Sequence, residues 1–167
     1  MISFLKSKKL FFLGLFVIAF IALADLYSKK QVFAILDNIA EKENILNPQI
    51  KVTNFFNLVK VWNRGISFGM FSKTENPKYF IIAVNFVIML GLLIWLYRNR
   101  HIYLTMAISL VIGGALGNLI DRLENGAVAD FLDFYYGMAH FPAFNIADSA
   151  ICVGAAMMFL EVFFKKK

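Results

Sequence analysis

The sequence contains almost none of the residues that build disulfide frameworks or metal sites. It has one cysteine and two histidines among 167 residues. One cysteine cannot form a disulfide or a cysteine-rich metal site within the chain. The histidines, His101 and His140, lie in loops that the topology predicted below puts on opposite sides of a membrane, so they cannot share a metal ion or a haem. We therefore expect no metal and no cofactor.

Charged residues are scarce as well, at 17% of the chain, whereas 60% of the residues are hydrophobic. This composition excludes an ordinary soluble domain and is typical of a membrane protein. The length of 167 residues fits a single domain, residues 1–167, without a separate soluble module. The net charge of +6 does not gather in one patch, because the basic residues flank the apolar runs, and we expect no nucleic-acid partner.

Four apolar runs come close to the roughly 20 residues that a helix needs to cross a bilayer. They cover residues 10–26, 79–97, 102–120 and 143–164. Basic residues precede the first run, separate the second from the third and end the chain, and no acidic residue stands in these three segments. The positive-inside rule places these segments and both termini in the cytoplasm, with residues 27–78 and 121–142 outside. The predicted fold is an all-α membrane protein with four transmembrane helices.

The first apolar run can also be interpreted as a cleavable secretory signal, because Ala22-Leu23-Ala24 before Asp25 is an acceptable cleavage site. The run is longer than the core of a typical signal, and the basic flanks of the other runs agree with an uncut first helix. We therefore expect a retained anchor.

The retained anchor has a direct test. Because no cut is expected after Ala24, protein purified from membranes should show the intact mass of residues 1–167. A mass lacking residues 1–24 would show the predicted topology to be wrong, because Asp25 would then be the N-terminus.

The outer segment 27–78 is the most polar part of the chain. Residues 27–46 favour a helix, which Asn47-Pro48 should end. Residues 49–62 interleave apolar and polar side chains, which predicts a small extracytoplasmic β element. The aromatic residues of the segment indicate either an interfacial belt or a platform on the membrane surface that holds an amphiphilic ligand, and the pattern does not separate these two interpretations.

The third apolar run carries GGALGNLIDRL at residues 113–123. Its three glycines allow a neighbouring helix to approach closely. Asn118, Asp121 and Arg122 follow at spacings of three and four, so they share one face at the outer end of the helix. They form either a salt-bridged helix terminus or part of a functional site.

Four aspartates fall at the outer ends of the predicted helices or in the short outer loop: Asp25, Asp121, Asp130 and Asp148. Asp148 taken alone is either a cap at a helix start or a functional group, because an ionised carboxylate in an apolar run is costly. Four carboxylates at one face exceed what capping needs. The apolar neighbours of Asp130 should raise its pKa, and the nearby Asp133 should face the other way if this stretch is extended.

Asp130 and Asp148 fit the chemistry of a carboxylate pair. Two close carboxylates in a pocket with little water cannot both ionise, so they share a proton and act as an acid and a base. Such a pair activates water against a peptide carbonyl without a metal or a covalent intermediate. Ser67 and Ser149 do not fit a nucleophile, because neither has a histidine in a supporting position.

The same residues carry a resemblance along nearly the full chain. The blocks are Asp25 and Lys29, then NRGISFG (63–69), GNLIDR (117–122), VADF (128–131) and FNIADS (144–149). In this order they resemble lipoprotein signal peptidase (signal peptidase II), a family of bacterial four-span aspartyl proteases that cut prolipoproteins before a lipid-modified cysteine. One departure is Ile66-Ser67, where the family commonly has alanine, and it bears on substrate fit.

The resemblance implies a catalytic dyad of Asp130 and Asp148, and Asn145 and Ala147 would give the substrate backbone a hydrogen-bonding group and room. The residues that it implies to bind substrate or brace the site are Asp25, Lys29, Asn63, Gly65, Asn118, Asp121, Arg122, Asn145 and Ala147. It also implies a small sheet that rests on the membrane, diacylglyceryl-modified prolipoproteins as substrates, membrane lipid as surroundings, and an active site at the outer face of the bacterial inner membrane. We expect a monomer.

An alternative function is a non-enzymatic four-helix carrier or a proton-coupled transporter, in which the same carboxylates bind a cation or relay protons. A carrier needs its site near the membrane midplane, open alternately to both sides. The predicted carboxylates gather at one face, so we favour the peptidase.

Overall fold

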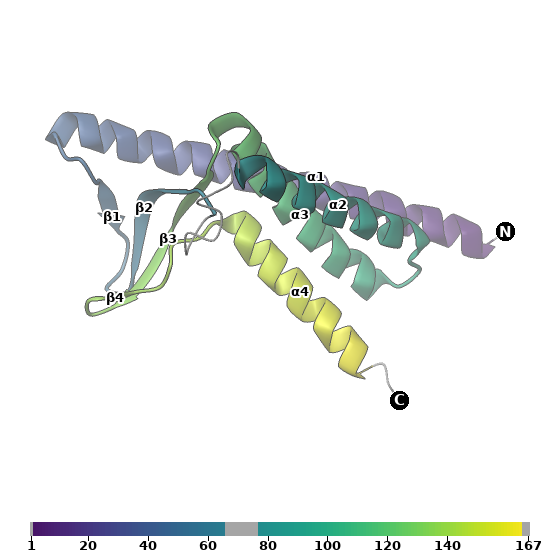
Figure 1. Ribbon diagram of the computed structural model, residues 1–167. Coiled ribbons are helices and arrows are strands. Elements are labelled where there is room, and N and C mark those ends of the chain that lie inside the picture. Colours follow the sequence, from purple (N-terminus) through teal and green to yellow (C-terminus); the bar gives the residue numbers. More distant parts are fainter. Residues whose placement is uncertain (1, 66–76, 165–167) are drawn as a thin grey trace.

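The computed structural model describes residues 2–65 and 77–164, and it joins a bundle of helices to a small sheet (Figure 1). The helices are α1 (Ile2–Glu43), α2 (Pro77–Arg98), α3 (Ile102–Asn125) and α4 (Ile146–Phe164). Each is long and apolar enough to cross a membrane, and the chain is a multi-pass membrane protein. The first turn of α1 and the last turn of α4 lie at the same end of the bundle, away from the sheet (Figure 1).

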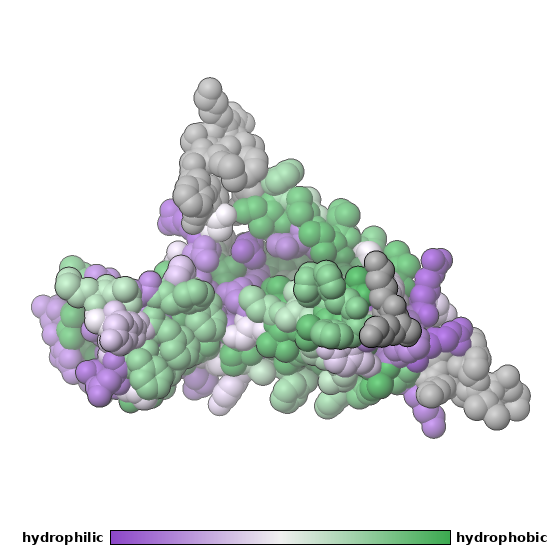
Figure 2. Space-filling view, turned by 90° about the horizontal axis from the view of Figure 1, so that it is seen from below, coloured by the Kyte–Doolittle hydropathy of each residue, from purple (hydrophilic) through white to green (hydrophobic). Residues whose placement is uncertain are grey.

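The outward surfaces of the helices are apolar. The most apolar windows of α2 and α4 bury only 6% and 17% of their residues inside the protein, whereas that of α3 buries 56%. Figure 2 shows hydrophobic side chains covering the helices, with hydrophilic ones at the sheet and at the far helix ends. A bilayer covers such apolar surface. Helix α3 is the central helix, because it buries the largest share of its residues and packs against α1, α2 and α4.

Helix α1 is one continuous helix, so the predicted first span and the predicted helix at 27–46 are joined. Its buried positions recur every three or four residues and form a single stripe. They are Gly14, Ile18, Ala22, Asp25, Lys29, Phe33 and Leu36. The stripe continues past the apolar run to reach the sheet, and it carries Asp25 and Lys29 into the protein interior.

Two glycines of α3 allow the close packing that the sequence predicts. A Cβ added at Gly117 would lie 2.5 Å from Oδ2 of Asp25 on α1. A Cβ added at Gly114 would collide with the backbone oxygen of Ala147 on α4. Any larger residue at these two positions would push α1 or α4 away from α3.

The sheet is antiparallel and has the strand order β1-β2-β3-β4. Its strands are β1 (Gln49–Lys51), β2 (Phe56–Asn63), β3 (Val128–Tyr136) and β4 (Ala139–His140). The predicted β element at 49–62 is therefore two strands, separated by residues 52–55. The sequence predicts an extended stretch around Asp133 only as a condition, because residues 128–131 are buried in succession and do not alternate. β4 is not predicted.

The register of β2 and β3 positions the site. Val61 lies opposite Asp130 and Trp62 lies opposite Ala129, after an irregularity between Leu58 and Val61. Opposite residues share a face of the sheet and successive residues alternate, so Asp130 and Trp62 point to different faces. On the second face, Trp62 packs edge-to-face on Phe33 of α1, with 5.2 Å between the ring centroids.

Candidate active site

The polar residues predicted to act gather where the sheet meets the middle of α1, the end of α3 and the start of α4. Asp25 and Lys29 come from α1, Asn118, Asp121 and Arg122 from the last two turns of α3, Asn63 from the end of β2, Asp130 from β3, and Asn145 and Asp148 from the start of α4. Residues more than 100 positions apart meet here, since the backbone N–H of Ala147 donates to Oδ1 of Asp25 over 2.9 Å. Ile66-Ser67 lies outside the described residues.

Lys29 is the centre of a buried ionic cluster. Its ammonium nitrogen lies 2.5 Å from Oδ2 of Asp25 and 2.8 Å from Oδ2 of Asp121. It also donates to the side-chain oxygen of Asn118 over 3.1 Å. All four residues are buried, and a buried ammonium is tolerated only with such partners. Two of the four aspartates are therefore ion-paired to the same lysine.

Asp130 and Asp148 are joined instead by two amides. Asn145 donates to Oδ1 of Asp130 over 2.7 Å and to the side-chain oxygen of Asn118 over 3.2 Å. Asn118 in turn donates to Oδ1 of Asp148 over 2.8 Å. Lys29 fixes the same Asn118 oxygen, so the Asn118 amide presents its NH₂ group to Asp148. The ionic cluster thus orients one carboxylate of the pair.

Asn145 also caps α4. Its side-chain oxygen accepts the backbone N–H of Asp148 over 2.9 Å, as an N-cap residue does. Asp148 stands in the first turn of α4, where the helix dipole favours a negative charge. The two interpretations of Asp148 are thereby separated: Asn145 provides the cap, and the carboxylate of Asp148 remains available to the site.

The two carboxylates have different surroundings. Asp130 is 1% exposed, whereas Asp148 is only partly buried. Burial, helped by the charge of Asp148, raises the pKa of Asp130 to about 6, although hydrogen bonds from Asn63 and Asn145 lower it. This agrees with the rise expected from the apolar neighbours of Asp130. Unequal environments are what divide a carboxylate pair into an acid and a base.

Asp121 does not form the predicted salt bridge with Arg122 among the residues described. Besides binding Lys29, it accepts the backbone N–H of Ala129 over 3.1 Å. The Arg122 guanidinium donates to the backbone oxygen of Asn118 over 3.2 Å. The end of α3 is therefore salt-bridged, but to Lys29 of α1 and not to Arg122, and Asp121 connects α3 to α1 and to the residue before Asp130.

Gly65 closes a turn over the site. Its φ of +71° suits glycine, and its N–H donates to the side-chain oxygen of Asn63 over 2.8 Å. The NH₂ group of Asn63 is then directed to Oδ2 of Asp130, at 2.9 Å. Ala147, in contrast, is fully buried and contacts Gly114. The expectation that Ala147 makes room for substrate is not met, because this residue packs α4 onto α3.

A cavity of about 320 Å³ opens beside Asp130. It is lined by residues 61–65, Asp130, Pro142 and Ala143. The sequence did not predict Arg64, Pro142 or Ala143 as lining residues. The sequence feature that could have indicated them is that they lie within three positions of the predicted site residues Asn63 and Asn145. Asp133 faces the opposite side of β3, where it accepts from Asn57 over 3.2 Å and contacts His140 at 2.9 Å.

Replacing Asp121 by Ala should destabilise the protein as well as reduce its activity. Removing one partner of a buried ion pair costs about 3–5 kcal/mol, which corresponds to a fall in melting temperature on the order of 10 °C in detergent. Asp121→Asn is the matched control, because it keeps an oxygen for the Ala129 N–H and should lose less. An Asp121→Ala protein with unchanged melting and no activity would instead indicate a direct catalytic role.

Comparisons with known proteins agree on one family. The model of signal peptidase (SPase) II matches residues 17–164. The chain is 43% identical over 152 residues to the lipoprotein signal peptidase of Shewanella pealeana, covering 88% of this chain and 84% of that protein. It is 42% identical over 156 residues to that of Shewanella loihica, covering 90% and 86%.

A solved structure shares the fold. It is a bacterial membrane enzyme determined by the in meso method, superposed with a TM-score of 0.72 at 26% sequence identity. The match covers 92% of this chain and 91% of the solved chain. The likeness therefore includes both the helices and the sheet.

Proposed function

The chain belongs to the signal peptidase II family, and from this membership we propose that Asp130 and Asp148 are the catalytic pair with which it removes signal peptides from prolipoproteins. The observation that carries the proposal is that the four aspartates form two pairs with different hydrogen-bonding partners. Asp25 and Asp121 are both ion-paired to Lys29, whereas the carboxylates of Asp130 and Asp148 receive only amide donors among the hydrogen bonds described.

Water is the nucleophile in the proposed reaction. One carboxylate of the pair takes a proton from the water, and the other protonates or polarises the scissile carbonyl. The two exchange roles as the amine leaves, so the pair ends in its starting protonation state. Asn118 and Asn145 hold both carboxylates in place throughout. The bond that breaks is the peptide bond before the diacylglyceryl-modified cysteine.

The position of the pair supports a peptidase over a carrier. Asp148 is in the first turn of α4, and β3 carries Asp130 outside the helices. A carrier needs its site near the middle of its helices, accessible from both sides. Carboxylates at the helix ends instead suit a substrate that arrives from one side.

We also propose the topology and the assembly state. The basic segments that flank the helices favour cytoplasmic termini in the bacterial inner membrane, with the site at the outer face. A monomer suffices for the reaction, because every residue of the proposed site belongs to one chain.

The pH dependence of cleavage should report the protonation state of the carboxylate pair. We expect kcat/KM for a lipidated precursor to fall as the pH rises through about 6, because burial raises the pKa of Asp130 to about 6, so that Asp130 holds the proton of the pair and must keep it to act as the acid. Asn63 donates to Asp130 and lowers its pKa, so Asn63→Ala should move this limb to higher pH. An unmoved limb in Asn63→Ala would exclude Asp130 as the group that titrates.

A cleavage assay tests the proposed function itself. Purified protein in detergent should cut a diacylglyceryl-modified precursor before its cysteine, and a chelator should have no effect. The control is the Asp148→Asn variant, which lacks one carboxylate of the proposed pair and should leave the precursor uncut. No cleavage of the lipidated precursor, with the protein folded by circular dichroism, would leave the carrier as the better account.

A further inference from the structure

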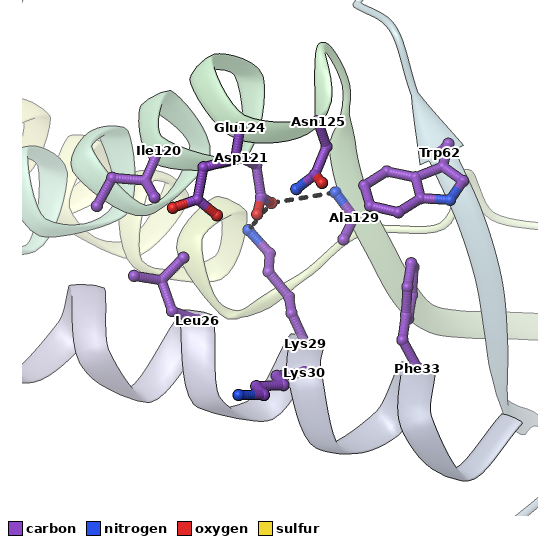
Figure 3. Close-up of a pocket in the computed structure, with 10 residues that line it drawn as sticks. All are labelled: Leu26, Lys29, Lys30, Phe33, Trp62, Ile120, Asp121, Glu124, Asn125 and Ala129. Carbon is purple, nitrogen blue, oxygen red and sulfur yellow. Dashed lines mark hydrogen bonds and ion pairs between the residues drawn. The ribbon is translucent and has the colours of Figure 1, made fainter. Parts of the chain in front are cut away.

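A second cavity, of about 400 Å³, lies behind the proposed active site. Trp62 and Ala129 line it and lie on the opposite face of β2 and β3 from Asp130. Figure 3 shows the cavity between α1 and α3, with Trp62 and Phe33 together at one end. The β2–β3 ribbon therefore lies between this rear cavity and Asp130, and Trp62 lines the cavities on both sides of it.

The rear cavity has an apolar part and a charged part. Leu26 on α1 and Ile120 on α3 supply the apolar lining. Lys30 and Glu124 stand four residues further along the same two helices, and therefore about one turn nearer the sheet. This order of apolar and then charged side chains matches the order of acyl chain and headgroup at a membrane interface.

The charges of the cavity are balanced. Lys29 and Asp121 form part of the wall, but they bind each other at 2.8 Å. Within residues 2–65 and 77–164, the side chains of Lys30 and Glu124 make no hydrogen bond or ion pair. The cavity thus offers one available cation and one available carboxylate, which suit a ligand that itself carries both signs. Trp62 adds an aromatic surface of the kind that attracts an ammonium group.

We propose that the rear cavity binds the headgroup of a zwitterionic membrane phospholipid. Its phosphate lies near Lys30, its ammonium near Glu124, and its acyl chains leave along Leu26 and Ile120 into the bilayer. This lipid is a resident ligand and not the substrate, because the β2–β3 ribbon lies between it and Asp130.

Native mass spectrometry of delipidated protein in detergent tests the proposal. Phosphatidylethanolamine should be retained in preference to phosphatidylglycerol, and the water-soluble glycerophosphoethanolamine should bind far more weakly. Lys30→Gln and Glu124→Gln should each weaken phosphatidylethanolamine binding about two- to fivefold, as expected for exposed charge pairs. Lys51→Gln and Glu43→Gln remove the same charges elsewhere on the surface and should have no effect.

Three results would overturn the proposal. The first is equal retention of the two lipids, and the second is equal loss of binding in the control variants. The third is equal binding of the soluble headgroup, which would assign the cavity to a soluble ligand. Lys30 and Glu124 are exposed, so their variants should fold and cut lipidated precursor. If the lipid proposal fails, the assignment of Asp130 and Asp148 as the catalytic pair is not affected.

Discussion

A precursor without its diacylglyceryl group should be cut at least a hundredfold more slowly than the same precursor after lipid transfer. Two acyl chains bury many methylenes, each contributing about 0.8 kcal/mol, and they hold the modified cysteine at a fixed depth. The helices that would set this depth also carry Asp148 and brace Asp130. Anchoring therefore positions the scissile bond, and a misplacement of about 1 Å can cost on the order of a hundredfold in rate.

The comparison requires one precursor measured before and after diacylglyceryl transfer, at the same detergent concentration. A precursor with serine in place of the cysteine cannot accept the lipid, and it serves as the control for handling. Equal rates for the lipidated and unlipidated forms would mean that the lipid is not recognised. The chain would then be a general intramembrane protease.

The parts of the fold that the sequence predicts are those with a local cause. The four spans follow from the length of their apolar runs, and the close packing of α3 follows from its glycines. The helix at 27–46 is also predicted, but its continuity with the first span and the buried stripe through Phe33 are not, because they depend on packing against the sheet. β3 is predicted only as a condition for a similar reason, since both of its faces are covered by other elements.

In the candidate site, too, the features with a local cause are predicted from the sequence and those that depend on tertiary packing are not. Asp130 and Asp148 indicate a carboxylate pair from sequence, because both stand in apolar surroundings at one predicted face of the membrane and few other chemistries fit such residues. Partner choice could not be predicted: Asp121 lies beside Arg122 in sequence, yet it binds Lys29, which is 92 positions away. Ala147 is a further case, because only the packing of α4 on α3 shows that it is buried.

Replacing Asp130 or Asp148 by Asn should lower kcat/KM by about a thousandfold or more, since each change removes an acid or a base. The variants should still fold. Asp148→Asn keeps an oxygen for the Asn118 amide. Asp130→Asn loses one of two amide donors, but it also removes a buried charge. We expect melting temperatures within about 4 °C of the unchanged protein, which corresponds to about 1 kcal/mol.

Single-turnover cleavage of a lipidated precursor by these two purified variants tests the carboxylate pair most directly. Asp133→Asn is the matched control, because it removes a buried aspartate from the opposite face of the same strand. The proposed mechanism predicts no measurable product from Asp130→Asn or Asp148→Asn, and cleavage close to that of the unchanged protein from Asp133→Asn. Measurable turnover by both of the first two variants would contradict the assignment of Asp130 and Asp148 as the catalytic pair.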